Sequence, residues 1–91
     1  MSEKLNLNVE QINFLGLIAT YAAAGWSALG KIPNPMTNKL DRNLEHAKNS
    51  IDILELLREK TKGNLTEEEE KYLDASIADL QINYLQEKTR G

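Results

Sequence analysis

The chain contains no cysteine, one histidine (His46) and only two prolines, which lie close together at Pro33 and Pro35. The lack of cysteine excludes disulfides, thiolate nucleophiles and cysteine-based metal sites, and it is compatible with the reducing cytoplasm, where we expect the protein to reside. The net charge of −3, with both signs mixed, lacks the basic surplus with which nucleic-acid-binding proteins neutralise phosphates. We therefore expect no nucleic-acid partner.

A second absence is local. Residues 11–30, QINFLGLIATYAAAGWSALG, contain no Asp, Glu, Lys or Arg, although the sequence after them is rich in charge. If the segment is a helix, its large apolar side chains cover an arc of roughly 220°, about twice the ~100° stripe of an ordinary surface helix. We predict that this helix is buried against the rest of the chain and still has apolar surface left over. The remaining arc carries a line of small or polar residues: Asn13, Gly16, Thr20, Ala23 and Ser27.

Three kinds of partner could cover the surplus apolar surface: a second copy of the chain, a different protein, or a membrane. Twenty helical residues span about 30 Å, which matches the hydrocarbon core of a bilayer. Against a membrane stand the polar residues within the segment and the amphipathic segments that follow it. Residues 1–10 also lack the net positive charge that begins a secretory signal, because Glu3 and Glu10 outnumber the single Lys4. These observations favour self-association over a different protein partner, and both over a membrane.

The scarcity of proline and the long periodic segments predict an all-α chain of three helices, over about residues 9–29, 38–62 and 67–87, after a loose arm over residues 1–8. Asn8 is the expected N-cap of the first helix, and Thr37 or Asn38 that of the second. Residues 31–38, KIPNPMTN, are expected to be a stiff connector, or alternatively a recognition loop. Two apolar seams are predicted to face the core: Leu40, Leu44, Ala47, Ile51 and Leu54 in the second helix, and Leu73, Ile77, Leu80 and Tyr84 in the third.

The residues of the junction between the second and third helices, residues 60–70 (KTKGNLTEEEE), are explained by helix capping. Gly63 is predicted to end the second helix with a positive φ, and Thr66 with Glu69 forms a capping box for the third helix. The alternative interpretation is a weak anion site built from Lys60, Lys62 and the helix N-terminus. The four glutamates at residues 67–70 would repel an anion, which favours the structural interpretation.

No residue pattern points to catalysis. His46 has no second ligand at a metal-binding spacing, the serines lack a neighbouring base, and the glycines do not form a phosphate loop. We therefore predict no enzyme activity, no catalytic or metal-binding residues and no cofactor. An enzyme remains possible only if a site forms between subunits, for example from Tyr21, His46 and Asp52.

The string KTKGNL at residues 60–65 follows IDIL at residues 51–54, and Leu29 and Gly30 precede Pro33 and Pro35. In these residues the sequence from Leu29 onward resembles a small bacterial family known as domain of unknown function 1844. The resemblance covers about two thirds of the chain, and the string KTKGNL after IDIL is its most specific part. It implies a helical, cytoplasmic, bacterial protein, and it carries over no activity and no functional residues. The residues that match are Leu29, Gly30, Pro33, Pro35, Ala47, residues 51–54, Leu57, residues 60–65, Glu69, Leu73, Leu80 and Tyr84.

Taken together, the patterns predict a three-helix antiparallel bundle that is completed by homo-oligomerisation, with a dimer as the default. The predicted function is that of a non-enzymatic interaction or assembly module that self-associates through its apolar first helix. The alternatives are an unidentified protein partner and a peripheral membrane-associated adaptor that uses the same helix. The apolar line of Ala78, Ile82 and Leu85 in the third helix also lacks a partner within the predicted bundle. The residues predicted to form the interface are Phe14, Leu15, Ile18, Tyr21, Trp26, Ile82 and Leu85.

Overall fold

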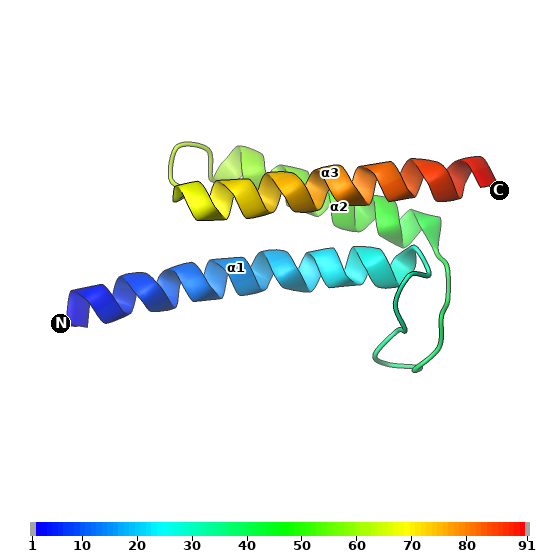
Figure 1. Cartoon of the computed structure of the whole chain (residues 1–91), viewed down its shortest axis with the longest axis horizontal. Coiled ribbons are helices and arrows are strands. Elements are labelled where there is room, and N and C mark those ends of the chain that lie inside the picture. Colours follow the sequence, from blue (N-terminus) through cyan, green and yellow to red (C-terminus); the bar gives the residue numbers. More distant parts are fainter. Residues whose placement is uncertain (1, 91) are drawn as a thin grey trace.

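The computed structural model describes the backbone of residues 2–90 and the side chains of residues 9–90. It contains three helices, α1 (Ser2–Ala28), α2 (Leu44–Lys60) and α3 (Glu67–Arg90). Figure 1 shows that α2 runs antiparallel to both α1 and α3, which point the same way. Each helix packs against the other two, and residues 2–90 contain no strand. The prediction of an all-α, three-helix antiparallel bundle is confirmed.

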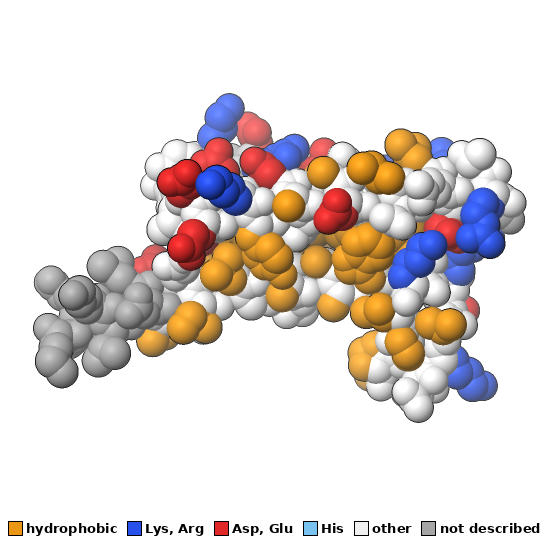
Figure 2. Space-filling model, in the orientation of Figure 1, with side chains coloured by type: hydrophobic (Ala, Val, Ile, Leu, Met, Phe, Trp, Pro, Cys, Tyr) orange, Lys and Arg blue, Asp and Glu red, His pale blue; other side chains and the backbone are white. Residues whose placement is uncertain are grey.

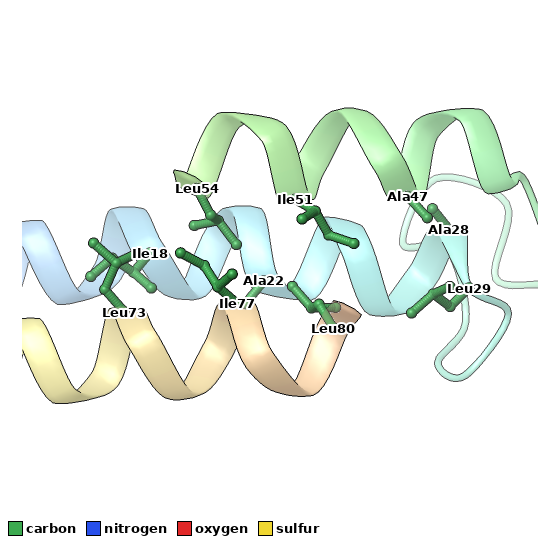
Figure 3. Packing of buried hydrophobic residues seen from close by; sticks show 10 residues of the cluster. All are labelled: Ile18, Ala22, Ala28, Leu29, Ala47, Ile51, Leu54, Leu73, Ile77 and Leu80. Atoms are coloured by element: carbon green, nitrogen blue, oxygen red, sulfur yellow. The ribbon is translucent and has the colours of Figure 1, made fainter. Parts of the chain in front are cut away.

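The core lies along the axis where the three helices meet, and Figure 3 shows its side chains pointing toward one another. The predicted seams of α2 and α3 supply most of it, and α1 contributes a narrower strip. Six of these side chains are large and fully buried, so each contributes about 1.5–3 kcal/mol by leaving water. The buried apolar residues are Ile18, Ala22, Ala28, Leu29, Ala47, Ile51, Leu54, Leu73, Ile77 and Leu80.

Helix α1 begins at Ser2, not at Val9, so the prediction of a loose arm is wrong for Ser2–Asn8. Met1 lies outside the described residues. No proline or glycine interrupts the chain before Gly16. Once a helix has formed, each further residue adds a hydrogen bond at little cost, and a polar residue such as Asn8 does not stop it. Asn8 is therefore an interior residue of α1 and not its cap.

Helix α2 begins at Leu44, six residues later than predicted, and ends at Lys60. Its N-cap is Asn43, whose side-chain oxygen accepts a hydrogen bond from the His46 backbone N–H at 3.1 Å. The predicted cap Asn38 instead has a φ of 58°, in the left-handed region, and belongs to a turn of the connector. Leu40 consequently lies outside the helix and is exposed, so its assignment to the apolar seam is wrong.

The second junction is built as predicted. Gly63 has a φ of 84°. The Glu69 N–H donates to Thr66 Oγ1 at 3.2 Å, and the Thr66 N–H donates to the Glu69 carboxylate at 2.8 Å. The reciprocal bonds confirm the capping box at the start of α3. Helix α3 then continues to Arg90, three residues beyond the predicted end.

Candidate interaction surface

The rotation of α1 about its axis decides which of its apolar residues remain available to a partner. Ile18, Ala22 and Leu29 face the core. Gly25 also lies on this side, because a Cβ there would be only 3.0 Å from Leu80 Cδ2 and 3.5 Å from Ser50 Cβ. The missing side chain lets α1 approach both other helices closely. The opposite side of α1 is thereby turned toward solvent.

We call this solvent side the α1 outer face. It combines exposed large apolar side chains with small residues: Val9, Ile12 and Leu17 are 52%, 65% and 40% exposed. Within residues 11–30 it carries no charge. Water-facing sides of helices are normally charged or polar, so the composition calls for a partner. The face consists of Val9, Ile12, Asn13, Gly16, Leu17, Thr20 and Ala23.

Helices α2 and α3 behave differently, because their solvent sides carry ion pairs. Lys48 Nζ lies 3.0 Å from the Asp52 carboxylate, one helical turn further along α2. Arg58 of α2 pairs with Asp74 of α3 at 3.2 Å. Such exposed pairs contribute little to stability, but they keep these surfaces hydrated. The uncharged outer face is thus peculiar to α1 among the described helices.

The α1 outer face carries two polar side chains, Asn13 and Thr20, and the hydroxyl of Thr20 is already satisfied. Thr20 Oγ1 donates to the Gly16 carbonyl oxygen of the preceding turn at 2.8 Å. A buried hydroxyl is costly mainly when it loses its hydrogen bond to water without replacement. The intrahelical bond removes most of that cost, so this part of α1 can be covered by another apolar surface.

The structure separates the seven predicted interface residues into three groups. Ile18 is fully buried in the core and is not available to a partner, so its assignment is corrected. Ile82 and Leu85 are 56% and 60% exposed, but they lie on the side of α3 away from the core seam and are not part of the α1 outer face. Four residues are half-buried and pack against the core: Phe14, Leu15, Tyr21 and Trp26.

Sequence reasoning did not find Val9, Ile12 and Leu17, which are the large exposed residues of the α1 outer face. The apolar arc of α1 is so wide that the pattern alone does not show which part of it faces the core. The line of small and polar residues through Gly16 and Thr20 was the available signal. In an ordinary surface helix such a line marks the solvent side.

The connector between α1 and α2, residues 29–43, projects from the bundle on the side of α1 opposite to α3 (Figure 1). Its interior is hydrogen-bonded: the Asn34 N–H donates to the Lys39 carbonyl at 2.8 Å, and the Met36 N–H donates to Asn34 Oδ1 at 2.8 Å. The ordered turn nevertheless exposes apolar side chains, with Met36 91% exposed and Leu40 66% exposed. Figure 2 shows hydrophobic side chains on this projection and along the junction of α1 with α3.

Both ends of the connector are fixed to the C-terminal part of α3 through Glu87. The carboxylate of Glu87 is nearly buried and lies 3.0 Å from Lys31 Nζ and 3.2 Å from Arg42 Nη1. Arg90 adds a third contact at 3.1 Å. The hydrogen bonds from Lys31 and Arg42 hold the pKa of Glu87 below its usual value, against the opposing effect of burial. The Asn43 N–H also donates to the Ala28 carbonyl at 2.7 Å, which closes the base of the connector.

The structure gives little support to the anion site or to an enzyme site. Lys60 and Lys62 are exposed, and the N–H of Glu69 in the first turn of α3 is already bonded to Thr66. Asp52 and His46 lie on the exposed side of α2, beside a shallow depression that Lys48 also lines. Among the described residues, no group of three potential ligands could hold a metal ion. None of the described helices has both the length and the apolar character needed to cross a bilayer.

The comparisons with known proteins place the chain in one family. No curated protein and no solved structure matches it. Residues 11–91, which include all of the bundle except the first turns of α1, match the family described as Domain of unknown function (DUF1844). The match extends the resemblance seen from Leu29 onward back through the uncharged part of α1. The chain belongs to the DUF1844 family.

Proposed function

We propose that the chain is a non-enzymatic assembly module that self-associates through the α1 outer face. The observation that carries the proposal is the exposure of Val9, Ile12 and Leu17 on a helix side that has no charge within residues 11–30. A second copy of the same face would meet no like charge there and no unsatisfied hydroxyl at Thr20. Isologous pairing of identical faces is the commonest route to a homo-oligomer.

The total surface of the chain supports the same proposal. Its accessible area is 6593 Å², about 1,200 Å² more than the roughly 5,400 Å² expected for a compact monomer of 10.3 kDa. The excess accompanies an elongated shape of 51 × 27 × 16 Å. A standard stable interface removes about 800 Å² from each partner. The chain therefore has enough surplus surface to form such an interface.

A peripheral membrane adaptor that uses the same helix is the rival proposal. Helices that lie on membranes usually combine an apolar face with a polar face rich in lysine and arginine. Residues 11–30 contain no lysine and no arginine. The composition of α1 therefore favours a protein surface over anionic lipid. The cytoplasmic location and bacterial origin expected from the sequence remain predictions.

The test is solution mass by light scattering after gel filtration, over a range of protein concentrations. We expect a mass near twice 10.3 kDa that falls toward 10.3 kDa on dilution. Leu17→Glu should raise the dimer dissociation constant about 100-fold, because the pairing would bury a carboxylate. The matched control is Leu56→Glu, since Leu56 is 55% exposed on α2 and should leave the mass unchanged.

A wild-type mass of 10.3 kDa at every concentration would overturn the proposal. So would a dimer that Leu17→Glu leaves intact. Flotation with vesicles containing anionic lipid separates the rival, because an assembly module should stay in the soluble fraction. Wild-type protein that floats, while Leu17→Glu protein does not, would support the membrane adaptor instead.

A further inference from the structure

We infer that two copies pair with their α1 helices antiparallel, so that the connector of each chain, residues 29–43, covers the exposed N-terminal part of the partner's α1 outer face. The inference depends on the proposed self-association and adds its geometry: the orientation of the pair and a second contact. The occupant of the surface is a second copy of this chain.

The layout of the α1 outer face indicates where the two helices cross. Its small residues, Gly16, Thr20 and Ala23, lie in the middle, whereas Val9 and Ile12 lie toward one end. No described atom outside the local helix lies within 4 Å of the point where a side chain of Gly16 would begin. Small residues at a crossing let two helix backbones approach closely. The natural crossing point is therefore midway between Gly16 and Ala23.

An antiparallel pair crossing at this point joins the two unpartnered apolar surfaces. In such a pair, the numbers of two residues that face each other across the interface add up to about 39, because both helices rise by the same 1.5 Å per residue from the crossing point. Val9 of one chain faces the end of the partner's α1 near Gly30, where the connector begins. The connector projects on the outer side of α1, away from α3 (Figure 1). The exposed Met36 and Leu40 are thus placed beside the partner's Val9 and Ile12.

Charge distinguishes the antiparallel pair from a parallel one. Glu10 is exposed next to the outer face, and a parallel pair would place the two Glu10 carboxylates near each other. The connector carries Lys31, Lys39 and Arg42 against the single acid Asp41. An antiparallel pair therefore places Glu10 near the more basic end of the partner. It also sets the two helix dipoles in the favourable opposite directions.

The connector is suited to this role because it is fixed before a partner arrives. The Glu87 contacts to Lys31 and Arg42 hold both of its ends, and its internal hydrogen bonds shape the turn that carries Met36. A surface that is already ordered loses little conformational freedom on binding. The ordering thus turns the exposed Met36 and Leu40 into a defined contact surface.

The test is cross-linking between single-cysteine variants, which the lack of native cysteine makes unambiguous. A short bismaleimide reagent should join Ile12→Cys chains to Met36→Cys chains when the two variants are mixed. Ile12→Cys alone should not cross-link, because its two copies would lie about 22 Å apart along the pair. Thr20→Cys alone should cross-link, since Thr20 lies at the crossing point. Leu56→Cys, on the outer side of α2, controls for random collision.

The outcomes separate the geometry from the proposed function. A parallel pair would cross-link Ile12→Cys chains to each other and would give no product that joins Ile12→Cys to Met36→Cys. That result would overturn this inference and leave self-association through α1 standing. A dimer mass without Thr20→Cys cross-linking would place the interface elsewhere and overturn both. Monomer mass without any cross-link would also overturn both. As a second readout, Met36→Asp should weaken the dimer about tenfold while leaving the helical circular dichroism unchanged.

Discussion

Glu87 links the C-terminal end of α3 to the connector. Its carboxylate is nearly buried, and it contacts Lys31 and Arg42 at the two ends of the connector as well as Arg90 on its own helix. A buried carboxylate with such partners is stabilising only while it is ionised, because the protonated form leaves the cations without their counter-charge. Conditions that protonate Glu87 should therefore loosen the connector.

The first prediction concerns pH. Because the folded-state pKa of Glu87 lies below its unfolded value of about 4.3, its contribution to the free energy of unfolding is full above about pH 5 and is lost as pH falls through the folded-state pKa. Urea unfolding between pH 6 and about pH 3 should show a steeper loss for wild type than for Glu87→Gln. The exposed Asp79→Asn variant is the control and should follow wild type. Equal slopes for wild type and Glu87→Gln would contradict the account.

The two glycines within α1 should respond differently to alanine. At Gly25 the added methyl group would lie 3.0 Å from Leu80, which is buried and has little room to move, and the resulting overpacking costs about 1–3 kcal/mol. At Gly16 the space is open, and the better helix propensity of alanine should add about 0.5–1 kcal/mol. Urea unfolding of both variants is measured in the Leu17→Glu background, so that the proposed dimer does not contribute to the stability. A Gly25→Ala variant as stable as Gly16→Ala would show that α1 does not need the close approach.

At the scale of helices and turns, the α2–α3 junction is the most locally determined part of the fold. Gly63, Thr66 and Glu69 each perform the role that their chemistry favours, and the bonds close within seven residues. Local bonds of this kind form without waiting for the tertiary structure. The connector shows the opposite case, since its path depends on Glu87, more than forty residues later.

Removal of the α3 cap should therefore destabilise the fold by a modest, local amount. Thr66→Ala removes the oxygen that accepts the Glu69 N–H, and we expect a loss of about 1 kcal/mol in the free energy of unfolding. Thr66→Ser keeps the hydroxyl and should retain most of the stability. Thermal unfolding followed by circular dichroism measures both. Equal losses in the two variants would mean that the methyl group of Thr66, and not its hydroxyl, stabilises the junction.

At the scale of the whole molecule, the protein is a thin three-helix bundle with one uncharged side. A small domain buries a limited part of its surface. The exposed apolar surface of α1 therefore lowers the stability of the isolated chain and would raise that of a dimer in which it is buried. Assembly and stability should therefore be linked. The dimer would stabilise the native state by mass action, whereas unfolded chains gain nothing from it.

The apparent melting temperature should consequently rise with protein concentration. For wild type we expect an increase of about 4 °C or more per tenfold rise in concentration, over the range in which dimers form. Leu17→Glu should melt at one temperature throughout, and Leu56→Glu should behave like wild type. A wild-type midpoint that does not change with concentration would contradict the coupling between assembly and folding.

Features that depend on local chemistry or strict periodicity can be predicted from the sequence of this chain. The all-α class, the core seams of α2 and α3 and the capping box at Thr66 all follow from spacings of three and four residues or from bonds between near neighbours. In α2 the charged residues lie on the side opposite the apolar seam, which favours one orientation. In α3 the seam of Leu73, Ile77 and Leu80 is buried, and the second apolar line with Ile82 and Leu85 stays exposed. For α2, the pattern therefore predicts the packing.

The rotation of α1 and the path of the connector depend instead on contacts between residues far apart in the sequence. A helix that is apolar over most of its circumference has no preferred side until its neighbours are in place. In the folded chain Gly25 lies so close to Leu80 that a Cβ there would be only 3.0 Å from Leu80 Cδ2. This orientation of α1 buries Ile18 and exposes Ile12 and Leu17, which no periodicity could show. Likewise, the delayed start of α2 accompanies long-range contacts of the connector with Glu87 and Ala28. Interactions between residues far apart in the sequence leave no local pattern, so the interface candidates became visible only in the folded chain.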